Sequence, residues 1–511
     1  MAQDGEVSLS ESREIERKYA VCPDARVPDL RDLPGVDRIR RRRPVTLQAQ
    51  YFDTDDLALL RERITLRKRV GGADEGWHLK LPGDGFRREL HVPLTDSNDV
   101  PEAFIERLHT VLRGRTPAPL VRLTTVRTIH ELLDASGAVL AELCDDQVSS
   151  TPDISGVEAL QWREWEVELA SASVELLAIA EPVLVEAGAS TDAGPSKLAR
   201  ALADVAPRAR PAIPELGSDP TVAEVARDYL RRESARLKSH DGGVRLHEDD
   251  AIHQMRVAAR RLRSVLSSYR DIVGRDRSMA LRVELKALAD ALGEARDSEV
   301  MLARLNALLD DQPTDRVRGP IRASIDSALR SRYDRAHDQA LEFMTSTRYY
   351  GLLDALDALV DDWDPAGGAV PANRLGKVFD RDWKRLRGAV LLADAIEETD
   401  EHQDALHDVR KSAKRLRYGM DSAYGVMGKD AKRVAKSATQ ITELLGEHND
   451  SVITAELIGD LADEAFARGE DTFTYGRMQA VEEASAAMSR DALTAAIAQL
   501  NEHRFAGWKK L

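Results

Sequence analysis

The sequence predicts two domains of different fold class, an antiparallel β domain (sheet, sandwich or barrel) followed by an all-α domain. From Glu14 to about Ala201, short segments of alternating apolar and charged residues are broken by Gly, Pro and Asp, which is typical of hairpin-connected strands. Long runs rich in Ala, Leu, Arg and Asp follow, and these favour helices. Pro207, Pro211 and Pro214 discourage both helix and strand between the two regions.

Composition and charge exclude several classes of protein. A chain of 511 residues is too long for one core, so at least two domains are expected. The 73 Lys and Arg are outnumbered by 88 Asp and Glu, and aromatics make up only 5%. Nucleic acid is therefore not an expected partner, and any polyanion site must be a local cluster of cations. Only two cysteines, a polar N-terminus and no long apolar run predict a cytoplasmic protein that does not enter a membrane.

In several expected strands of the first region, every second residue is charged or polar, so these residues share one face of the strand. The strands are expected at Thr46–Phe52, Ile64–Val70, Gly76–Leu81, Arg87–Val92, Leu120–Leu132, Val139–Val148 and Trp162–Leu169, with a helix near Glu102–Leu112. Residues that share a charged face are Thr65, Arg67 and Arg69; His78 and Lys80; Arg87 and Glu89; and Glu164, Glu166 and Glu168. A single strand of this kind normally faces water. Repetition over several strands instead suggests a barrel with its charged face inward.

The segment Glu14-Ile15-Glu16-Arg17-Lys18 is the first candidate for a metal-binding and phosphate-binding strand. In an extended strand Glu14, Glu16 and Lys18 share one face, with the two carboxylates roughly 6–7 Å apart. Such a pair can bracket a hard divalent cation, and a lysine beside it suits a phosphate oxygen. Taken alone, the pattern more often marks a solvated strand. Inside a barrel, its cations would clasp phosphates and its carboxylates would hold Mg²⁺ or Mn²⁺.

The ordered motifs of this region resemble the CYTH family, the triphosphate tunnel metalloenzymes, over residues 6–205. They are Glu14-x-Glu16-x-Lys18, Tyr51-Phe52-Asp53-Thr54, Leu66-Arg67-Lys68-Arg69, Trp77-His78-Leu79-Lys80, Arg87-x-Glu89, Arg127, Glu164-x-Glu166-x-Glu168 and Ser196-Lys197. The resemblance implies an eight-stranded antiparallel tunnel that binds a linear triphosphate together with Mg²⁺ or Mn²⁺. Members of the family include inorganic, thiamine and RNA triphosphatases and one class of adenylate cyclase.

The resemblance also implies a role for each matching residue. The phosphate-binding residues would be Lys18, Arg67, Arg69, Lys80, Arg87, Arg127 and Lys197. The metal ligands would be Glu14, Glu16, Glu166, Glu168 and an acidic residue of the penultimate strand, for which we take Asp145 with Asp146 as the alternative. Glu14, Glu16, Lys18, Glu166 and Glu168 would form the catalytic set. Cations and metal would neutralise the phosphates, and a second metal or one of the glutamates would activate water for direct hydrolysis.

The second region contains an internal repeat. Ile252–Arg263 matches Leu406–Arg417, and Leu292–Ser298 matches Leu445–Ser451 at nearly the same spacing, which indicates two copies of one helical bundle. In each copy, apolar residues at 3/4 spacing predict a core stripe: Ile252, Met255, Ala259, Leu262 and Leu266, then Leu406, Val409, Ala413, Leu416 and Met420. Beside each lies a basic stripe: His253, Arg256, Arg260 and Arg263, then His407, Arg410, Lys414 and Arg417.

The repeated His-x-x-Arg-x-x-x-(Arg/Lys)-Arg-Leu-Arg element resembles the CHAD domain over residues 220–511. A single basic stripe is most often a solvated face, whereas two copies headed by histidine favour an anionic partner, because stacked cations repel one another. The resemblance implies two pseudo-symmetric four-helix bundles whose basic surface binds inorganic polyphosphate. A metal site at His253 or His407 is disfavoured because neighbouring cations would repel the metal.

Together these patterns predict three segments: a tunnel domain at 6–205, a proline-rich linker at 206–219 and a helical domain at 220–511. The expected function is metal-dependent hydrolysis of inorganic triphosphate or short polyphosphate in the tunnel, with polyphosphate binding by the helices. The alternatives are a non-enzymatic polyphosphate-binding or granule-targeting protein, an adenylate cyclase and a thiamine triphosphatase. Association with polyphosphate granules in the cytoplasm is a further expectation, and the sequence makes no prediction about oligomeric state.

Overall fold

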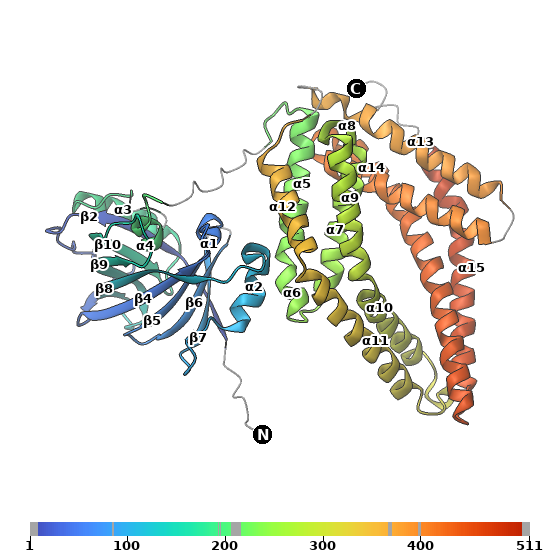
Figure 1. Cartoon of the computed structure of the whole chain (residues 1–511), viewed down its shortest axis with the longest axis horizontal. Helices are drawn as coiled ribbons and strands as arrows, with labels where there is room; N and C mark the ends of the chain where they lie inside the picture. The colour runs from blue at the N-terminus through green and yellow to red at the C-terminus, as the bar shows by residue number, and fades with distance from the viewer. Residues whose placement is uncertain are drawn as a thin grey trace. The chain divides into compact units, whose positions relative to one another are not determined.

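The computed structural model describes residues 9–83, 86–192, 194, 196–205, 216–365, 370–396 and 400–502. The chain divides into two compact units, Met1–Ile213 and Pro214–Leu511. The first is built on a curled antiparallel sheet, and all regular structure described in the second is helical (Figure 1). The predicted order of an antiparallel β domain followed by an all-α domain is confirmed. Most of the predicted linker, residues 206–215, lies outside the described residues.

The sheet contains ten strands in the order β1-β7-β6-β5-β4-β8-β9-β10-β2, with β3 paired to β8 off this path. The strands are β1 Ser10–Glu14, β2 Glu16–Val21, β3 Arg38–Arg41, β4 Val45–Asp53, β5 Thr65–Val70, β6 Gly76–Pro82, β7 Arg87–Pro93, β8 Ala118–Leu133, β9 Val139–Pro152 and β10 Gln161–Leu169. Every strand pair in it is antiparallel. All seven strands expected from the sequence are present, with small differences at their ends.

The first two strands bring the ends of the sheet together. β1 pairs with β7 and β2 pairs with β10, although only Ile15 separates them in the chain. The carbonyl oxygen of Ile15 accepts a hydrogen bond from the Leu169 amide at 3.0 Å, which continues the β10 pairing up to this break. The sheet is therefore curled into a half-barrel whose two edge strands belong to one stretch of chain. The prediction of one continuous strand from Glu14 to Lys18 is wrong. The chain pairs with β7 before Ile15 and with β10 after it.

The count of ten strands rather than eight has two causes. The stretch around Ile15 contributes two strands, and Arg38–Arg41 forms the additional strand β3, which pairs with β8. In that run, Arg40 and Arg42 both pair with the carboxylate of Glu131 on β8, Arg42 at 2.7 Å. The carboxylate of Glu131 thus partly neutralises the charges of both arginines.

Apolar residues cover the outside of the curled sheet and leave the charged phase inside. The short helices of this unit are α1 Ala58–Arg61, α2 Glu102–Leu112, α3 Glu175–Glu186 and α4 Lys197–Ala201. Trp77 of β6 clusters with Phe104 of α2, and Trp165 of β10 clusters with Leu177 and Leu184 of α3. Both tryptophans are almost fully buried. Because side chains alternate along a strand, burying this face against helices directs the opposite, charged face into the half-barrel.

The second unit is a set of long helices (Figure 1). They are α5 Val222–Ser239, α6 Asp241–Arg245, α7 Ala251–Ser268, α8 Arg270–Val273, α9 Arg275–Ala291, α10 Gly293–Asp310, α11 Ile321–Met344, α12 Thr347–Asp361, α13 Leu375–Asp394, α14 Asp400–Ala467 and α15 Phe473–Glu502, with 3₁₀ turns at Thr314–Arg316 and Ala372–Arg374. No helix among the described residues is both long enough and apolar enough to cross a membrane.

Equivalent glycines show that the sequence repeat is also structural. Gly274, between α8 and α9, has a positive φ of 95°, and Gly428, at the kink inside α14, has a positive φ of 57°. Their separation is the same as that between Ile252 and Leu406. Since glycine adopts positive φ readily, both copies change direction at the same place. The kink divides α14 into two helices that correspond to α7 and to α9–α10.

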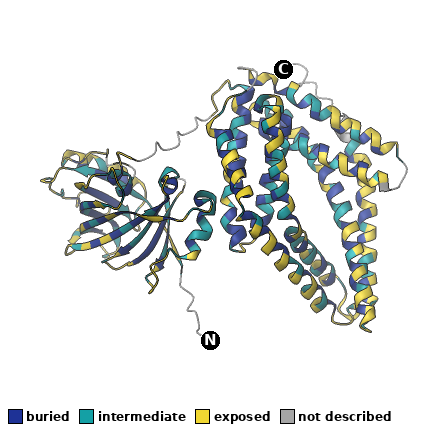
Figure 2. Ribbon diagram, viewed as in Figure 1, coloured by how far each residue is buried: buried dark blue, intermediate teal, exposed yellow. Residues whose placement is uncertain are grey.

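The predicted core stripes are confirmed. All ten apolar residues predicted for the two copies are buried in one hydrophobic cluster that contains helices of both repeats. Figure 2 shows the buried face running along the length of these helices, with exposed residues on the opposite side. The 3/4 spacing of large apolar residues thus determines which face of each helix is packed.

Candidate functional site

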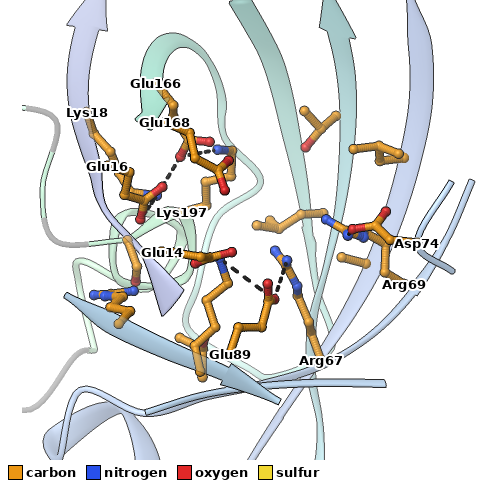
Figure 3. Close-up of a pocket in the computed structure, with 18 of the residues that line it drawn as sticks. Glu14, Glu16, Lys18, Arg67, Arg69, Asp74, Glu89, Glu166, Glu168 and Lys197 are labelled. Atoms are coloured by element: carbon orange, nitrogen blue, oxygen red, sulfur yellow. Dashed lines mark hydrogen bonds and ion pairs between the residues drawn. The ribbon is translucent and has the colours of Figure 1, made fainter. Parts of the chain in front are cut away.

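A cavity of about 230 Å³ lies within the half-barrel, and its wall carries charges of both signs (Figure 3). The predicted residues that line it are Glu14, Glu16, Lys18, Arg67, Arg69, Lys80, Arg87, Arg127, Glu166, Glu168 and Lys197. They come from seven strands and from the first residue of α4. The structure therefore brings together all the predicted phosphate-binding residues, and all the predicted carboxylates except Asp145.

Strands β5 and β6 place cations at successive levels along the wall. Thr65 is opposite Lys80, Arg67 is opposite His78 and Arg69 is opposite Gly76. Alternate residues of a strand share a face and lie on the order of 6–7 Å apart. Each level has its own carboxylate partner: Lys80 pairs with Glu14, Arg67 with Glu89 and Arg69 with Asp74.

A second group of charges is centred on the ammonium of Lys197. Its Nζ atom lies 2.9 Å from Asp146 and 2.7 Å from both Glu164 and Glu166. The guanidinium of Arg127 lies 2.6 Å from Asp146 and 2.7 Å from Glu166. Three buried carboxylates thus hold two cations in fixed positions at the cavity wall, which satisfies the requirement that buried charges be paired.

Pairing keeps this group ionised despite burial. Burial opposes the charge of Glu166, but Lys18, Lys197 and Arg127 hold its pKa well below the usual value. Burial likewise opposes the charge of Lys197, and the carboxylates around it raise its pKa well above the usual value. Lys18 contacts Glu16 at 3.1 Å as well as Glu166, and its pKa is raised for the same reason. The cations are therefore charged and oriented before any ligand arrives.

Glu14 differs from the carboxylates around Lys197. Burial and a hydrogen bond with Glu89 raise the pKa of Glu14 to about 7, although Lys80 acts in the opposite direction. Burial would also raise the pKa of Glu89, but hydrogen bonding by His78 and the charge of Lys80 lower it. The imidazole of His78 is 3.0 Å from Glu89 through Nδ1. Glu14 and Glu89 thus form a hydrogen-bonded carboxyl pair whose surroundings favour the charged form of Glu89.

Glu14, Glu16 and Glu168 are the other predicted carboxylates that line the cavity. Glu16 of β2 is directly opposite Glu168 of β10, and like charges in that relation repel unless a cation lies between them. Burial raises the pKa of Glu168, with Glu16 adding to the effect and Lys80 opposing it. Oxygen donors of this kind suit Mg²⁺ and Mn²⁺. These carboxylates come from the two edge strands β1 and β2 and from β10 and line one cavity, so their donor chemistry fits such an ion.

Asp146, Glu164 and Glu166 form another acidic cluster, with one oxygen of each within 4.8 Å of the others. The ammonium of Lys197 contacts all three carboxylates. A metal ion at the same position would meet that positive charge. We therefore assign this cluster to Lys197 and Arg127 rather than to a metal.

The prediction of Asp145 as a metal ligand is wrong. Asp145 is opposite Trp165 on β10, on the face that packs outward, and its carboxylate binds the guanidinium of Arg163 at 2.8 Å. Asp146 is opposite Glu164 and points inward instead. A shift of one residue along a strand reverses the face. The register between β9 and β10, which places Asp146 opposite Glu164, decides between the two residues, and the sequence alone does not supply it.

Two further cavity residues were given no role from the sequence. Glu89 was placed on a charged face, and the structure shows that it joins Arg67, Lys80 and His78. Asp74 belongs to the turn between β5 and β6, where no alternation indicates the direction of a side chain, so sequence reasoning had no signal for it.

In the helical unit, the basic stripes of the two repeats meet only in part. Burial lowers the pKa of Lys414 to about 7, and the charges of Arg410, Arg260 and Arg256 lower it further. The pKa of Arg260 is lowered by burial and by Arg256 and Arg410, against the effect of Tyr418. These four cations, two from α7 and two from α14, therefore form one cluster of mutually repelling charges, which we call the central basic cluster.

The remaining stripe residues surround this cluster or lie apart from it. Burial lowers the pKa of His253 and of His407, and cations of their own stripes add to the effect. Burial also lowers the pKa of Arg263, which Asp290 opposes. The guanidinium of Arg417 stacks on the ring of Tyr418, 5.4 Å from its centroid. Arg263 and Arg417 thus interact mainly with side chains outside the central basic cluster.

Glycines allow the central arginines to approach neighbouring helices closely. Arg256 donates a hydrogen bond to the carbonyl oxygen of Gly293 at 3.0 Å. A Cβ atom on Gly446, the equivalent residue of the second copy, would lie 3.1 Å from the guanidinium of Arg410. The repeated Leu-Gly-Glu motif therefore has a packing role: it leaves space for an arginine of the basic stripe.

Comparison with known families identifies both halves of the chain. A CYTH domain matches residues 12–201, and a CHAD domain matches residues 228–459. The uncharacterized protein Rv2226 of Mycobacterium tuberculosis is 37% identical over 508 residues, which span 96% of each chain. The chain belongs to the CYTH–CHAD proteins. The recognition of both domains from sequence is confirmed, and with it membership of the triphosphate tunnel family, whose CYTH domains are divalent-metal-dependent triphosphatases or cyclases.

Solved structures with detectable similarity include one bacterial and one plant protein. PptA from Streptomyces chartreusis is 21% identical, with a TM-score of 0.43, and the match covers 54% of this chain and 99% of PptA. The CHAD domain from the plant Ricinus communis is 24% identical, with a TM-score of 0.44, and the match covers 58% of this chain and 96% of that domain.

Proposed function

We propose that this CYTH–CHAD protein hydrolyses inorganic triphosphate or short linear polyphosphate in the tunnel cavity, with Mg²⁺ or Mn²⁺, and binds polyphosphate through the central basic cluster. The observation that carries the proposal is the composition of the cavity wall. It combines cations at successive levels with the carboxylates Glu14, Glu16 and Glu168. Glu168 is directly opposite Glu16, and a site that only held a polyanion would gain nothing from placing two like charges in that relation.

The cations account for substrate binding and for part of the catalysis. Lys18, Arg127 and Lys197 are fixed by Glu166 and its neighbours, so they need no reorganisation when phosphate charge develops in the transition state. Arg67 and Lys80 extend the array along β5 and β6. The divalent ion, held by Glu14, Glu16 and Glu168, would supply further charge neutralisation at the phosphate oxygens. The natural substrate would be a linear phosphoanhydride.

The helical unit favours a polyanion for a different reason. Arg256 and Arg410 are close enough to lower the pKa of both Arg260 and Lys414, so the folded protein carries electrostatic repulsion that a bound anion would relieve. A flexible chain of phosphates can contact Arg256, Arg260, Arg410 and Lys414 simultaneously. Polyphosphate bound here would tether the enzyme to chains longer than its tunnel accommodates.

The test of hydrolysis is phosphate release from inorganic triphosphate with Mg²⁺ and with Mn²⁺. The Glu14→Gln/Glu16→Gln variant should lose this activity, because both substitutions remove metal ligands and leave the cations in place. Glu11→Gln is the matched control, since Glu11 lies on β1 beside this pair but faces outward and binds Arg88 at 2.8 Å. Metal-dependent release that survives in the double variant, or no release by the unmodified protein, would contradict the proposed reaction.

The test of tethering is binding to long-chain polyphosphate. Arg260→Ala/Lys414→Ala should weaken binding, whereas Arg322→Ala/Lys286→Ala removes the same two residue types from exposed ion pairs on α11 and α9 and should leave it nearly unchanged. Equal losses in the two double variants would indicate a non-specific charge effect. Polyphosphate binding together with no hydrolysis of any phosphoanhydride would leave a binding protein.

A further inference from the structure

The turn between β5 and β6 places a carboxylate of the protein itself among the cations of the tunnel. Asp74 forms an ion pair with Arg69, and both residues line the cavity. The side chain of Arg69 is only 8% exposed, whereas that of Asp74 is 58% exposed. Figure 3 shows the two side chains facing each other on the side of the cavity away from Glu16 and Lys18. Asp74 thus reaches a nearly buried cation from a solvent-accessible position.

The position of this ion pair along the strands is informative. Lys80, opposite Thr65 at the first level of β5, contacts Glu14, and Arg67 at the next level contacts Glu89. Arg69 is the last cation of the series, two residues beyond Arg67. The carboxylates at the first two levels belong to strands, whereas Asp74 comes from the turn that follows β5. It therefore closes the series at the end opposite the proposed metal ligands.

The turn is fixed by its own contacts. Gly71 and Gly72 have positive φ angles of 83° and 105°, and a Cβ atom on Gly71 would lie 2.2 Å from the carbonyl oxygen of Thr46. The Gly71 amide donates a hydrogen bond to the side chain of Glu75 at 2.6 Å. The buried ring of His78 lies 3.0 Å from the carbonyl oxygen of Asp74 through Nε2. These contacts hold the Asp74 side chain over the tunnel.

An anion beside Arg69 would stabilise the positive charge of its guanidinium, which its surroundings oppose. Burial, with the nearby charges of Arg67 and Arg127, lowers its pKa to about 10. Asp74 supplies that anion in the absence of substrate. A phosphate group that reached Arg69 would compete with the carboxylate for the same guanidinium, and the two anions would repel one another.

We propose that Asp74 is a chain-length determinant of the tunnel. A triphosphate held between the metal ligands and Arg67 leaves the Asp74–Arg69 pair intact, whereas a longer linear polyphosphate has to displace the carboxylate from Arg69. Asp74 thereby favours triphosphate over longer chains. This inference rests on the proposed function, because it concerns the substrate of the same cavity.

The test compares Asp74→Asn, which keeps the shape of the side chain and removes its charge, with the unmodified protein. The measured quantity is the ratio of kcat/KM for linear tetraphosphate to kcat/KM for triphosphate. Asp74→Asn removes the charged contact that tetraphosphate has to displace, and this contact is stronger than a fully exposed ion pair because Arg69 is nearly buried. The ratio should therefore rise roughly fivefold to tenfold. Glu75→Gln removes a charge from the same turn without touching Arg69 and should leave the ratio unchanged.

A second measurement separates this inference from the proposed reaction. Calorimetric binding of both phosphates is measured in EDTA with the full chain carrying Arg260→Ala/Lys414→Ala, so that binding to the tunnel is observed with little contribution from the helices. Tighter tetraphosphate binding with Asp74→Asn, at unchanged triphosphate affinity, supports the inference even if no variant hydrolyses phosphate and the proposed reaction fails. An unchanged preference, an equal effect of Glu75→Gln, or no binding of either anion to the tunnel overturns it.

Discussion

Lys414 should make polyphosphate binding depend on pH in a way that can be calculated from its surroundings. Burial and the charges of Arg410, Arg260 and Arg256 lower its pKa to about 7, while Asp450 opposes them only partly. A bound polyanion favours the charged lysine and so raises that pKa towards its usual value. Binding is therefore coupled to the uptake of a proton by Lys414 when the pH exceeds 7, and affinity must fall as the pH rises.

The magnitude follows from the protonated fraction. With a pKa of about 7, Lys414 is charged in about half of the molecules at pH 7, in about one-tenth at pH 8 and in about one-hundredth at pH 9. Affinity should therefore fall roughly fivefold between pH 7 and pH 8, and continue to fall until it reaches that of Lys414→Ala. Burial lowers the pKa of His253 and of His407 below the usual value.

The assay is equilibrium binding to long-chain polyphosphate, whose internal phosphates do not titrate near neutral pH, at constant ionic strength from pH 7 to pH 9. Lys414→Arg is the matched control, because arginine keeps its charge throughout this range. Its binding should be nearly independent of pH, and any contribution from the tunnel is common to both proteins. An equal decline in the unmodified protein and in Lys414→Arg would refute the assignment of the pH dependence to Lys414.

Three other substitutions test separate parts of the structure. Glu166→Gln leaves three buried cations without a shared partner and should destabilise the tunnel domain by about 3–5 kcal/mol, with added triphosphate restoring part of the melting temperature in calorimetry. Glu168→Gln should raise the metal concentration needed for half-maximal phosphate release, whereas Asp145→Asn should not change it. Leu416→Ala removes a fully buried side chain and should cost about 2–5 kcal/mol, measured by denaturant unfolding; a loss below about 1 kcal/mol would contradict the core assignment.

Side-chain periodicity explains how much of the tunnel could be predicted from the sequence. Alternation over successive strands identified the inward face, because a strand has only two faces and the outward one is packed against helices. It could not place Asp145 and Asp146, since the choice depends on the register between β9 and β10, which no local pattern encodes. It also could not show that the chain changes partner strand at Ile15, because both sides of that residue are extended.

In the helical unit, too, the sequence predicted the features that depend on local periodicity and did not predict those that depend on how distant segments pack. The 3/4 spacing predicted which residues of α7 and α14 are buried, because helix periodicity alone fixes the apolar face. The meeting of Arg256 and Arg260 with Arg410 and Lys414 depends on how the two repeats pack, and a stripe of four residues on one helix does not reveal which of them will be shared. Two internal copies were the only sequence signal that pointed to such a meeting.

The cations of the tunnel are paired with carboxylates, whereas those of the central basic cluster repel one another. This difference fits the functions proposed for the two domains. In the tunnel, Lys18, Arg127 and Lys197 are neutralised by carboxylates already in place, so a substrate gains from fixed geometry, and the proposed metal ion would bind the remaining glutamates. In the helical unit, burial and the charges of Arg410, Arg260 and Arg256 lower the pKa of Lys414, so an anion gains by relieving repulsion and needs no metal. A pre-neutralised, rigid site suits selective chemistry on a short substrate, whereas an under-neutralised cluster suits strong and unselective capture of a long one. The same ligand chemistry is thus used for reaction in one domain and for retention in the other.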